Sequence, residues 1–147
     1  MIVVGIDGSD GARRALAFAV EEALLRDSDL RIVAAWHVPA QLFTAGVVTG
    51  QYGVDAFETS MRTAAEKQVA EAMTNREGLR YELAVLEGNA AVVLAEESER
   101  AELLVVGSRG HGGFSSLLLG SVSQQCAAHA VCPVAIVPAH ARPRPVG

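Results

Sequence analysis

The sequence is poor in aromatic residues and has no long hydrophobic run, and both shortages limit what it can be. Only 5% of its 147 residues are aromatic although 50% are hydrophobic, so the core must be built from Ala, Val, Leu and Ile. No apolar run approaches the roughly 20 residues that cross a bilayer. Residues 1–5 are too short for a signal peptide and lack its basic flank. We therefore expect one soluble, cytoplasmic domain without a membrane partner.

Cysteine is also scarce. Cys126 and Cys132 are the only two cysteines, with neither C-x-x-C spacing nor a nearby histidine pattern for zinc. Two cysteines cannot build a disulfide framework. We expect two small hydrophobic residues that are buried in a reducing compartment.

The shortage of lysine excludes one well-known phosphate site. Lys67 is the only lysine and lies in a helical pattern, so the chain has no P-loop, G-x-x-x-x-G-K-[ST]. The early glycines Gly5, Gly8 and Gly11 do not form G-x-G-x-x-G, and no acidic residue ends the second predicted strand. A G-x-S-x-G nucleophile elbow is missing as well. Dinucleotide binding and serine hydrolase chemistry are therefore unsupported.

Acidic residues are missing from the last third of the chain. All 17 Asp and Glu and nine of the 12 Lys and Arg lie in residues 1–102, which carry −8. Residues 103–147 contain three arginines and no carboxylate, and so carry +3. The net charge of −5 argues against general affinity for nucleic acid. The basic third of the chain, in contrast, has no local carboxylate that would repel an anion.

Short apolar runs alternate with helical patterns along the chain. Strands are predicted at 2–7, 30–38, 80–86, 103–106 and 133–137, and helices at 12–26, 55–76, 89–100 and 121–130. This alternation predicts an α/β fold: one doubly wound parallel sheet with helices on both faces. The charged face of 80–86 indicates an edge strand. Residues 39–53 are predicted to be an irregular flap, and 139–147 a disordered tail.

Three helix starts carry capping signals. Ser9 or Asp10 is suited to cap the first helix, and Asn89 the third. Ser121 and Gln124 form an S-x-x-Q capping box at the last helix.

A ligand site is expected where two sequence features converge. In doubly wound sheets ligands bind beyond the carboxyl ends of the strands, where the strand order reverses. Asp7 follows the first strand, and Gly107 opens the glycine-rich loop 107–120 after the fourth. If those strands are neighbours, both features border one crevice. A glycine-rich loop that leads into a helix can gather backbone N–H groups around a phosphate, and Gly107 and Gly110 have no side chains to obstruct it.

The spacing Gly107-x-x-Gly110, nine residues and Gly120-Ser121 resembles the G-x2-G-x9-G-[ST] nucleotide signature of the universal stress protein family. The resemblance runs through about Val137 and includes the opening V-V-G-I-D-G-S, the segment 30–36 and the helix start 88–91. It implies a universal stress protein domain over 1–138. It also implies a five-stranded sheet of order 3-2-1-4-5, Rossmann-like and similar to the adenine nucleotide alpha hydrolases.

The ATP-binding branch of that family implies a nucleotide site drawn from distant parts of the chain. The ribose and adenine are expected beside residues at the ends of central strands: Gly5, Ile6 and Asp7 for the ribose, and Ala35, Val106 and Gly107 for the base. The phosphates are expected among residues of the loop and the helix start: Gly110, Gly120, Ser121, Val122 and Ser123. Trp36, the only tryptophan, should lie close to the adenine pocket.

Several residues keep two interpretations. Asp7 is a ribose ligand or a turn former, and Ser121 contacts a phosphate or only caps its helix. His111 donates to a phosphate or lies in solvent. Arg109 contacts a phosphate or points outward.

The residues favour binding over catalysis. Hydrolysis needs a group that positions water and usually a bound metal. The loop has neither a lysine nor paired carboxylates, so any Mg²⁺ or Mn²⁺ would be held mainly by the phosphates. We expect an ATP-binding regulatory module in the stress response with little or no turnover. The alternatives are a slow ATPase or nucleotide-dependent transferase, a dimeric interaction protein without nucleotide, and a cyclic AMP binder.

A homodimer is expected as well. The last strand, Pro133–Val137, is apolar and should lie at an edge of the sheet, where unpaired backbone groups are exposed unless covered. The resemblance implies antiparallel pairing of this strand with its copy.

Overall fold

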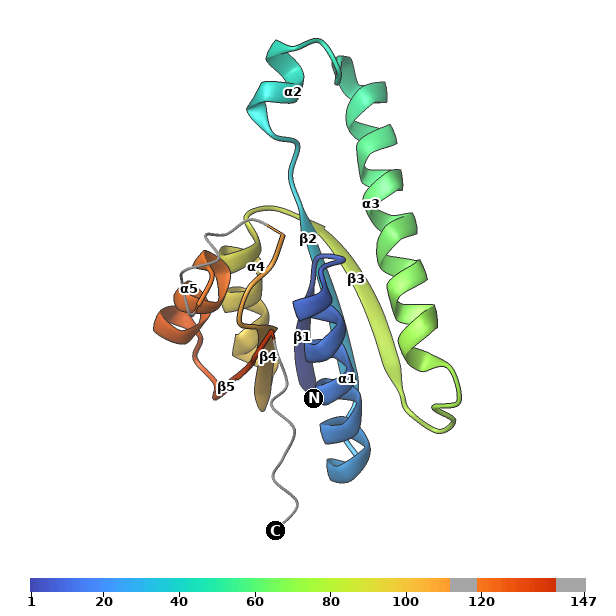
Figure 1. Ribbon diagram of the computed structural model, residues 1–147, viewed down its shortest axis with the longest axis vertical. Coiled ribbons are helices and arrows are strands. Elements are labelled where there is room, and N and C mark those ends of the chain that lie inside the picture. The colour runs from blue at the N-terminus through green and yellow to red at the C-terminus, as the bar shows by residue number, and fades with distance from the viewer. Residues whose placement is uncertain (112–118, 140–147) are drawn as a thin grey trace.

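The computed structural model describes residues 1–111 and 119–139. The stretch 112–118 of the predicted loop and residues 140–147 of the predicted tail lie outside the described residues. Five parallel strands form one sheet in the predicted order β3-β2-β1-β4-β5 (Figure 1). The strands are β1 (Ile2–Ile6), β2 (Leu30–Trp36), β3 (Tyr81–Glu87), β4 (Leu103–Gly107) and β5 (Val134–Val137). The helices are α1 (Asp10–Arg26), α2 (Ala40–Thr44), α3 (Gly50–Met73), α4 (Ala90–Glu97), the 3₁₀ turn η1 (Ser98–Arg100) and α5 (Ser121–His129).

The sheet separates two hydrophobic cores, because successive side chains of a strand point to opposite faces. In β1, Ile2, Val4 and Ile6 pack toward α1 and α3, whereas Val3 packs toward α4 and α5. Helices therefore cover both faces of the sheet, as predicted. The central strands β1 and β4 are buried along almost their whole length, which explains why they read as continuous apolar runs.

The strand order reverses at β1, which lies between β2 and β4. The register pairs Ile2 with Leu30 on one side and with Leu103 on the other. The condition for a shared crevice is therefore met: Asp7 and Gly107 follow neighbouring strands at the same edge of the sheet.

The prediction of an irregular flap at 39–53 is wrong. This stretch contains α2 and the first turn of α3, which starts five residues before the predicted position and rises beyond the sheet (Figure 1). Both Val47 and Val48 donate their N–H groups to the carbonyl of Leu42, and Val48 is buried. Gly46 and Gly50 have φ angles of 69° and 59°, which let the chain reverse between the two helices.

Two of the three predicted helix caps are confirmed. Ser9 Oγ accepts the N–H of Ala12 at 3.1 Å. Asn89 Oδ1 accepts the N–H of Ala91 at 3.0 Å and that of Val92 at 3.3 Å. Each cap thus satisfies N–H groups that have no acceptor inside the first helical turn.

The predicted capping box at Ser121 is wrong. Gly120 is the N-cap of α5, with extended backbone (φ −77°, ψ 172°), and its N–H donates to the carbonyl of Ser108 at 2.6 Å. Ser121 is therefore already the first helical residue. Gln124 Nε2 donates to the carbonyl of Leu119 instead of the N-cap residue. The loop anchors the helix start one residue earlier than the motif suggests.

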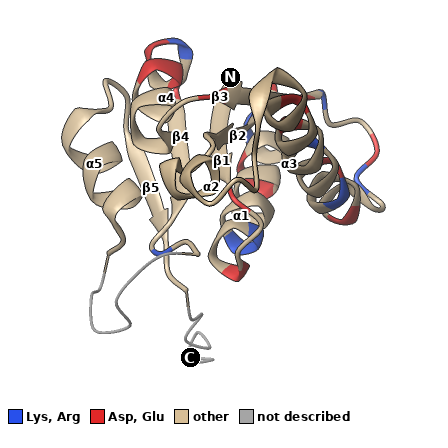
Figure 2. Ribbon diagram, turned by 90° about the horizontal axis from the view of Figure 1, so that it is seen from above, with Lys and Arg blue, Asp and Glu red and all other residues tan. Residues whose placement is uncertain are grey.

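Charged residues are distributed unevenly over the fold. They gather on α1, on α3 and at the end of α4, whereas α5 and β5 carry none (Figure 2). Arg31 and Glu97 form a partly buried ion pair, with Arg31 Nε 2.6 Å from Glu97 Oε2. Cys126 and Cys132 are both free thiols, and burial raises the pKa of Cys126 to about 11. Cys126 is fully buried as expected, whereas Cys132 is only partly buried.

The cap at Asn89 provides a stability test. Asn89→Ala removes the acceptor for two N–H groups, which should lower the free energy of unfolding by about 1 kcal/mol and the melting temperature by about 2–4 °C. Thr49→Ala is the matched control, since Thr49 is the N-cap of α3 but makes no side-chain capping bond. Thermal unfolding followed by circular dichroism measures both. Equal losses in the two variants would contradict the capping role.

Candidate functional site

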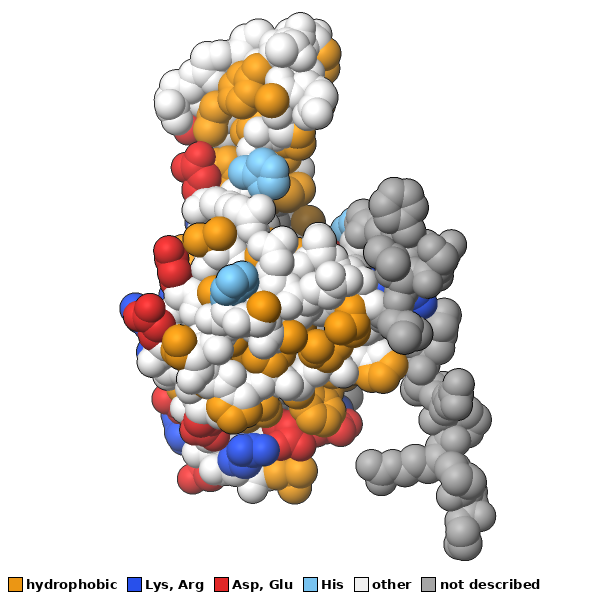
Figure 3. Space-filling model, turned by 90° about the vertical axis from the view of Figure 1, so that its left-hand side faces the viewer, with side chains coloured by type: hydrophobic (Ala, Val, Ile, Leu, Met, Phe, Trp, Pro, Cys, Tyr) orange, Lys and Arg blue, Asp and Glu red, His pale blue; other side chains and the backbone are white. Residues whose placement is uncertain are grey.

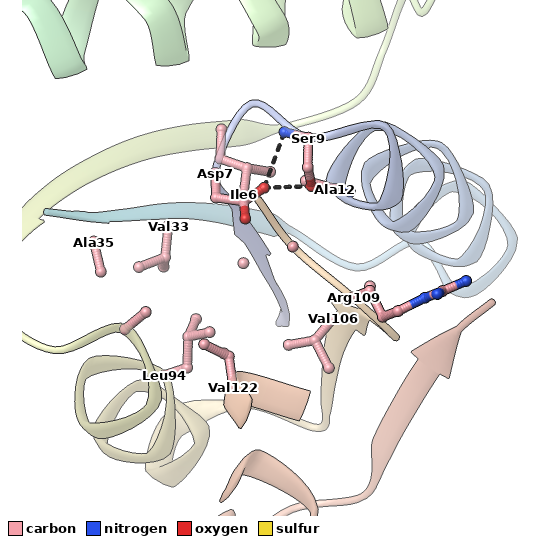
Figure 4. Close-up of a pocket in the computed structure, with 14 residues that line it drawn as sticks. Ile6, Asp7, Ser9, Ala12, Val33, Ala35, Leu94, Val106, Arg109 and Val122 are labelled. Carbon is pink, nitrogen blue, oxygen red and sulfur yellow. Dashed lines mark hydrogen bonds between the residues drawn. The ribbon is translucent and has the colours of Figure 1, made fainter. Parts of the chain in front are cut away.

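An apolar pocket of about 80 Å³ lies at the carboxyl ends of β1, β2 and β4, next to the starts of α1, α4 and α5 (Figure 4). The structure brings eight of the eleven residues of the sequence-predicted site to this pocket: Gly5, Ile6, Asp7, Ala35, Val106, Gly107, Gly110 and Val122. They come from positions more than 100 residues apart in the chain. The topology thus joins the two halves of the predicted site.

The other three predicted residues lie around the start of α5. Ser121 is exposed and lines an adjoining pocket of about 370 Å³ that shares Ala35 and Val122 with the first. Gly120 is buried and lines neither of these two pockets. The Ser123 hydroxyl is buried between the carbonyl of Ser108 (2.9 Å) and that of Gly120 (3.0 Å). Ser123 therefore holds the loop against the helix rather than facing the pocket.

Asp7 stands at the rim of the pocket with its carboxylate held in place. Its Oδ1 accepts the N–H and the hydroxyl of Ser9, at 3.0 and 2.5 Å, and its Oδ2 accepts the N–H of His111 at 3.3 Å. A carboxylate offers about four acceptor positions, so this one can still accept from a ligand hydroxyl. The contact with Ser9 is visible in Figure 4. Ser9 thus caps α1 and orients Asp7, a second role that its sequence position did not indicate.

Two glycines of the loop after β4 lie in close contact with the segment between β1 and α1 and with the first turn of α1. Neither Gly107 nor Gly110 has a positive φ. A Cβ at Gly107 would lie 2.9 Å from the backbone of Gly11, and a Cβ at Gly110 would collide with the Asp7 carboxylate. At Gly120 the nearest atom would be 3.4 Å away, an ordinary contact. Gly107 is therefore constrained by the backbone of Gly11 and Gly110 by the Asp7 carboxylate, while the expectation that both leave room for a phosphate stays a prediction.

The apolar wall of the pocket includes residues that no motif marks. Val33 comes from β2, and Ala90 and Leu94 from α4 (Figure 4). Leu94 lies so close to β1 that a Cβ at Gly5 would be 2.7 Å from its Cδ1. Val33 and Ala90 lie in the segments 30–36 and 88–91 that resemble the family, but the sequence does not mark either one as a pocket residue, and Leu94 is signalled only as an apolar position of a predicted helix.

The two ambiguous loop residues lie on different sides of the site. Arg109 lines the pocket with its backbone end, while Figure 4 shows its guanidinium directed away. His111 is exposed beside Asp7 and Gly8.

The first turns of three helices border this pocket, and among the described residues only that of α5 has no side-chain cap. Ser9 caps α1 and Asn89 caps α4, but no side chain among the described residues caps α5. The N–H groups at the start of α5 therefore have no side-chain acceptor within residues 1–111 and 119–139, and they lie at the positive end of the helix dipole. Between 103 and 139 the sequence holds no carboxylate to occupy them.

The described residues contain no group of three or more His, Cys, Asp or Glu that could hold a metal ion. Within the same residues, no helix combines the length and the apolarity needed to cross a membrane.

A doubly wound parallel sheet with a pocket at its switch point defines a Rossmann-like α/β domain. The model of the universal stress protein family matches residues 1–138. The chain belongs to the universal stress protein family.

Individual relatives agree with this family. A universal stress protein of Thermus aquaticus is 38% identical over 142 residues, covering 92% of this chain and 96% of the relative. The Mycobacterium tuberculosis universal stress protein Rv3134c is 38% identical over 143 residues, and the chain spans only half of its length. A crystal structure of a universal stress protein in complex with cAMP is 26% identical, with a TM-score of 0.64, over 95% of this chain and 96% of that one.

Gly107 and Gly120 differ in how much space a Cβ would find, and this difference can be tested. Gly107→Ala should lower the free energy of unfolding by about 1–3 kcal/mol, because the new methyl group forces the loop away from Gly11. Gly120→Ala is the matched control and should cost at most about 1 kcal/mol, since its Cβ meets nothing closer than 3.4 Å. Denaturant unfolding measures both. A Gly120→Ala loss as large as that of Gly107→Ala would show that the contact with α1 is not the constraint.

Proposed function

We propose that the chain binds an adenine nucleotide, ATP in the first place, in the crevice at the switch point. In this proposal it acts as a nucleotide-dependent regulatory module of the cytoplasmic stress response. The observation that carries the proposal is the uncapped start of α5, which opens beside an apolar pocket with Asp7 on its opposite rim.

The start of α5 is suited to hold phosphates. The first internal bond of this helix runs from the N–H of Gln124 to the carbonyl of Gly120, so the N–H groups of residues 121–123 have no acceptor within the helix. Their partial positive charge favours an anion. Ser121 adds an exposed hydroxyl at the same place. Any Mg²⁺ or Mn²⁺ in this arrangement is held mainly by the phosphates.

The rest of the crevice suits a nucleoside. Ala35, Leu94 and Val122 supply apolar surface for the faces of a base. Asp7 supplies a fixed carboxylate that can accept a hydrogen bond from a ribose hydroxyl. Asp7 and Val122 are far apart in the sequence, but the pairing of β1 with β4 brings them to the same edge of the sheet.

Cyclic AMP is the second candidate ligand. It is supported by the 26% identical universal stress protein whose crystal structure is a complex with cAMP.

Binding with little or no turnover is the form of the proposal that the residues favour. Hydrolysis would require a group that orients water at the terminal phosphate. Asp7 is the only carboxylate among the described residues that line the pocket, and this proposal places it against the ribose, on the rim opposite the phosphates at the start of α5. We infer that nucleotide occupancy changes the shape or the partners of the protein instead.

A charge at the start of α5 tests the phosphate contact. Ser121→Glu places a carboxylate among the uncapped N–H groups, which should weaken ATP binding at least tenfold without unfolding the helix, because acidic residues are favourable in a first turn. Adenosine, which has no phosphate, should bind equally well to both proteins. Ala127→Glu adds the same charge at an exposed site further along α5 and is the control. Trp36 fluorescence and calorimetry with ATP, ADP, GTP and cyclic AMP provide the affinities.

Three results of this experiment would count against the proposal. No response to any nucleotide by either method leaves the dimeric interaction protein as the better function. Equal weakening by Ser121→Glu and Ala127→Glu would remove α5 as the phosphate site. Sustained ADP release beyond one equivalent, lost in Gly107→Ala, would establish the slow ATPase.

We also propose that the protein forms a homodimer through the β5 edge. β5 is the last strand of the sheet, and its four residues are apolar and only partly buried. The side of the molecule formed by α4 and α5 displays many hydrophobic side chains, with charged ones along its left edge and at its lower end (Figure 3). Val131, just before β5, is 71% exposed. A second copy of β5 would satisfy the free edge and cover this surface.

A surface substitution tests the dimer. Val131→Glu should shift the protein from dimer to monomer at micromolar concentration, because pairing would bury its charge. Val47→Glu is the control, since Val47 is 70% exposed but lies between α2 and α3, far from β5 in Figure 1. Light scattering gives the molar mass. A wild-type protein that is monomeric throughout would rule out the interface.

A further inference from the structure

A second cavity, of about 160 Å³, lies on the α3 side of the sheet at the ends of β1 and β2. It shares Ile6, Asp7 and Ala35 with the first pocket, and the middle of α3 supplies four of its ten lining residues. Most of its lining is apolar: Ile6, Ala34, Met61, Ala64 and Ala65. One water needs about 10–15 Å³ by this measure, so the cavity has room for a considerably larger molecule.

Two buried side chains that line this cavity carry unpaired hydrogen-bond donors. They are the indole Nε1 of Trp36 and the amide Nε2 of Gln68, and neither has a partner among the described residues. Trp36 is 6% exposed and Gln68 5%. An unpaired buried donor costs about 1–3 kcal/mol, so two of them beside one cavity require an explanation.

The orientation of the Gln68 amide follows from its other contact. Gln68 Oε1 accepts the N–H of Gly8 at 3.0 Å. Because a backbone N–H can only donate, the oxygen must face Gly8 and the NH₂ group must point elsewhere. Trp36 is likewise fixed, since its ring packs on Phe57 with centroids 6.1 Å apart. The indole N–H can only donate a hydrogen bond. Both groups are therefore donors without an acceptor among the described residues.

The charges around the cavity define what it can accept. Asp7 stands at the edge shared with the crevice, and none of the lining residues that the structure describes is basic. An anion would meet repulsion from Asp7 without any compensating cation. A neutral acceptor oxygen on an apolar body, in contrast, would match both the donors and the walls.

We propose that this cavity binds a small uncharged molecule that carries a carbonyl acceptor, such as a carboxamide or a ketone, on an apolar body. Trp36 and Gln68 donate to the acceptor oxygen, while Met61 and the alanines of α3 contact the apolar part. The site can be tested separately from nucleotide binding, because Gln68, Ala34 and Ala64 line this cavity and neither of the other two pockets, whereas Trp36 and Met61 also line the pocket beside Ser121.

Benzamide is a suitable probe, with benzoate as the charged analogue and toluene as the analogue without an acceptor. Trp36 is the only tryptophan, so its fluorescence and its single indole N–H signal in NMR report directly on the cavity. Benzamide should bind saturably and move both signals, at least fivefold more tightly than benzoate or toluene. Gln68→Leu should weaken benzamide binding by about fivefold to tenfold, the effect of one lost hydrogen bond, and leave toluene unchanged.

Two further variants complete the test. Gln41→Leu makes the same chemical change at an exposed position of α2 and should leave benzamide binding intact. Ala64→Leu fills the cavity while keeping both donors, so it should abolish benzamide binding even if Gln68→Leu does not fold. Binding should persist in Ser121→Glu, which separates this site from the nucleotide proposal. The proposal would be overturned if benzamide and toluene bound with equal affinity, or if Ala64→Leu had no effect on benzamide binding. It would also be overturned if benzamide showed no saturable binding, which would mean that the cavity holds only water.

Discussion

The close contact between the loop after β4 and the start of α1 is the constraint on which the site depends. Gly107 packs against the backbone of Gly11, and Gly110 leaves space for the Asp7 carboxylate. Asp7 is tied back to α1 through Ser9 and to the loop through the His111 N–H. Two segments about 100 residues apart therefore form one rigid rim. Without glycine at these places the loop would be pushed off the helix, and the crevice between them would change shape.

The helices that begin beside the pocket differ in whether a side chain caps their first N–H groups. Ser9 and Asn89 saturate the first N–H groups of α1 and α4, whereas the start of α5 has Gly120 in the cap position. The contrast depends on the loop, because the bond from the Gly120 N–H to Ser108 fixes where α5 begins. The missing capping box thus strengthens the case for an external anion at α5. The absence of carboxylates from residues 103–139 has the same effect.

Two of the cavities at the carboxyl edge of the sheet lie on opposite faces of it. The crevice toward α4 and α5 is bordered by a free helix start, and the cavity toward α3 by neutral donors. Asp7 and Ala35 border both, because β1 and β2 end between the two cores. In our two proposals the same carboxylate disfavours an anion in one cavity and accepts a hydrogen bond from the ligand in the other.

The sequence by itself determined the parallel sheet, the two edge strands, a cap of α1 at Ser9 or Asp10 and the cap of α4 at Asn89, because hydrophobic periodicity and short polar side chains act over a few residues. It also supplied the spacing that identified the family. Only the tertiary structure decided which atoms approach which. The role of the loop glycines, the second contact of Ser9, the helices within 39–53 and the true start of α5 all depend on partners far along the chain. No local pattern encodes such partners. The unpaired donors of Trp36 and Gln68 belong to the same group, since burial of a polar atom is a property of the packed fold.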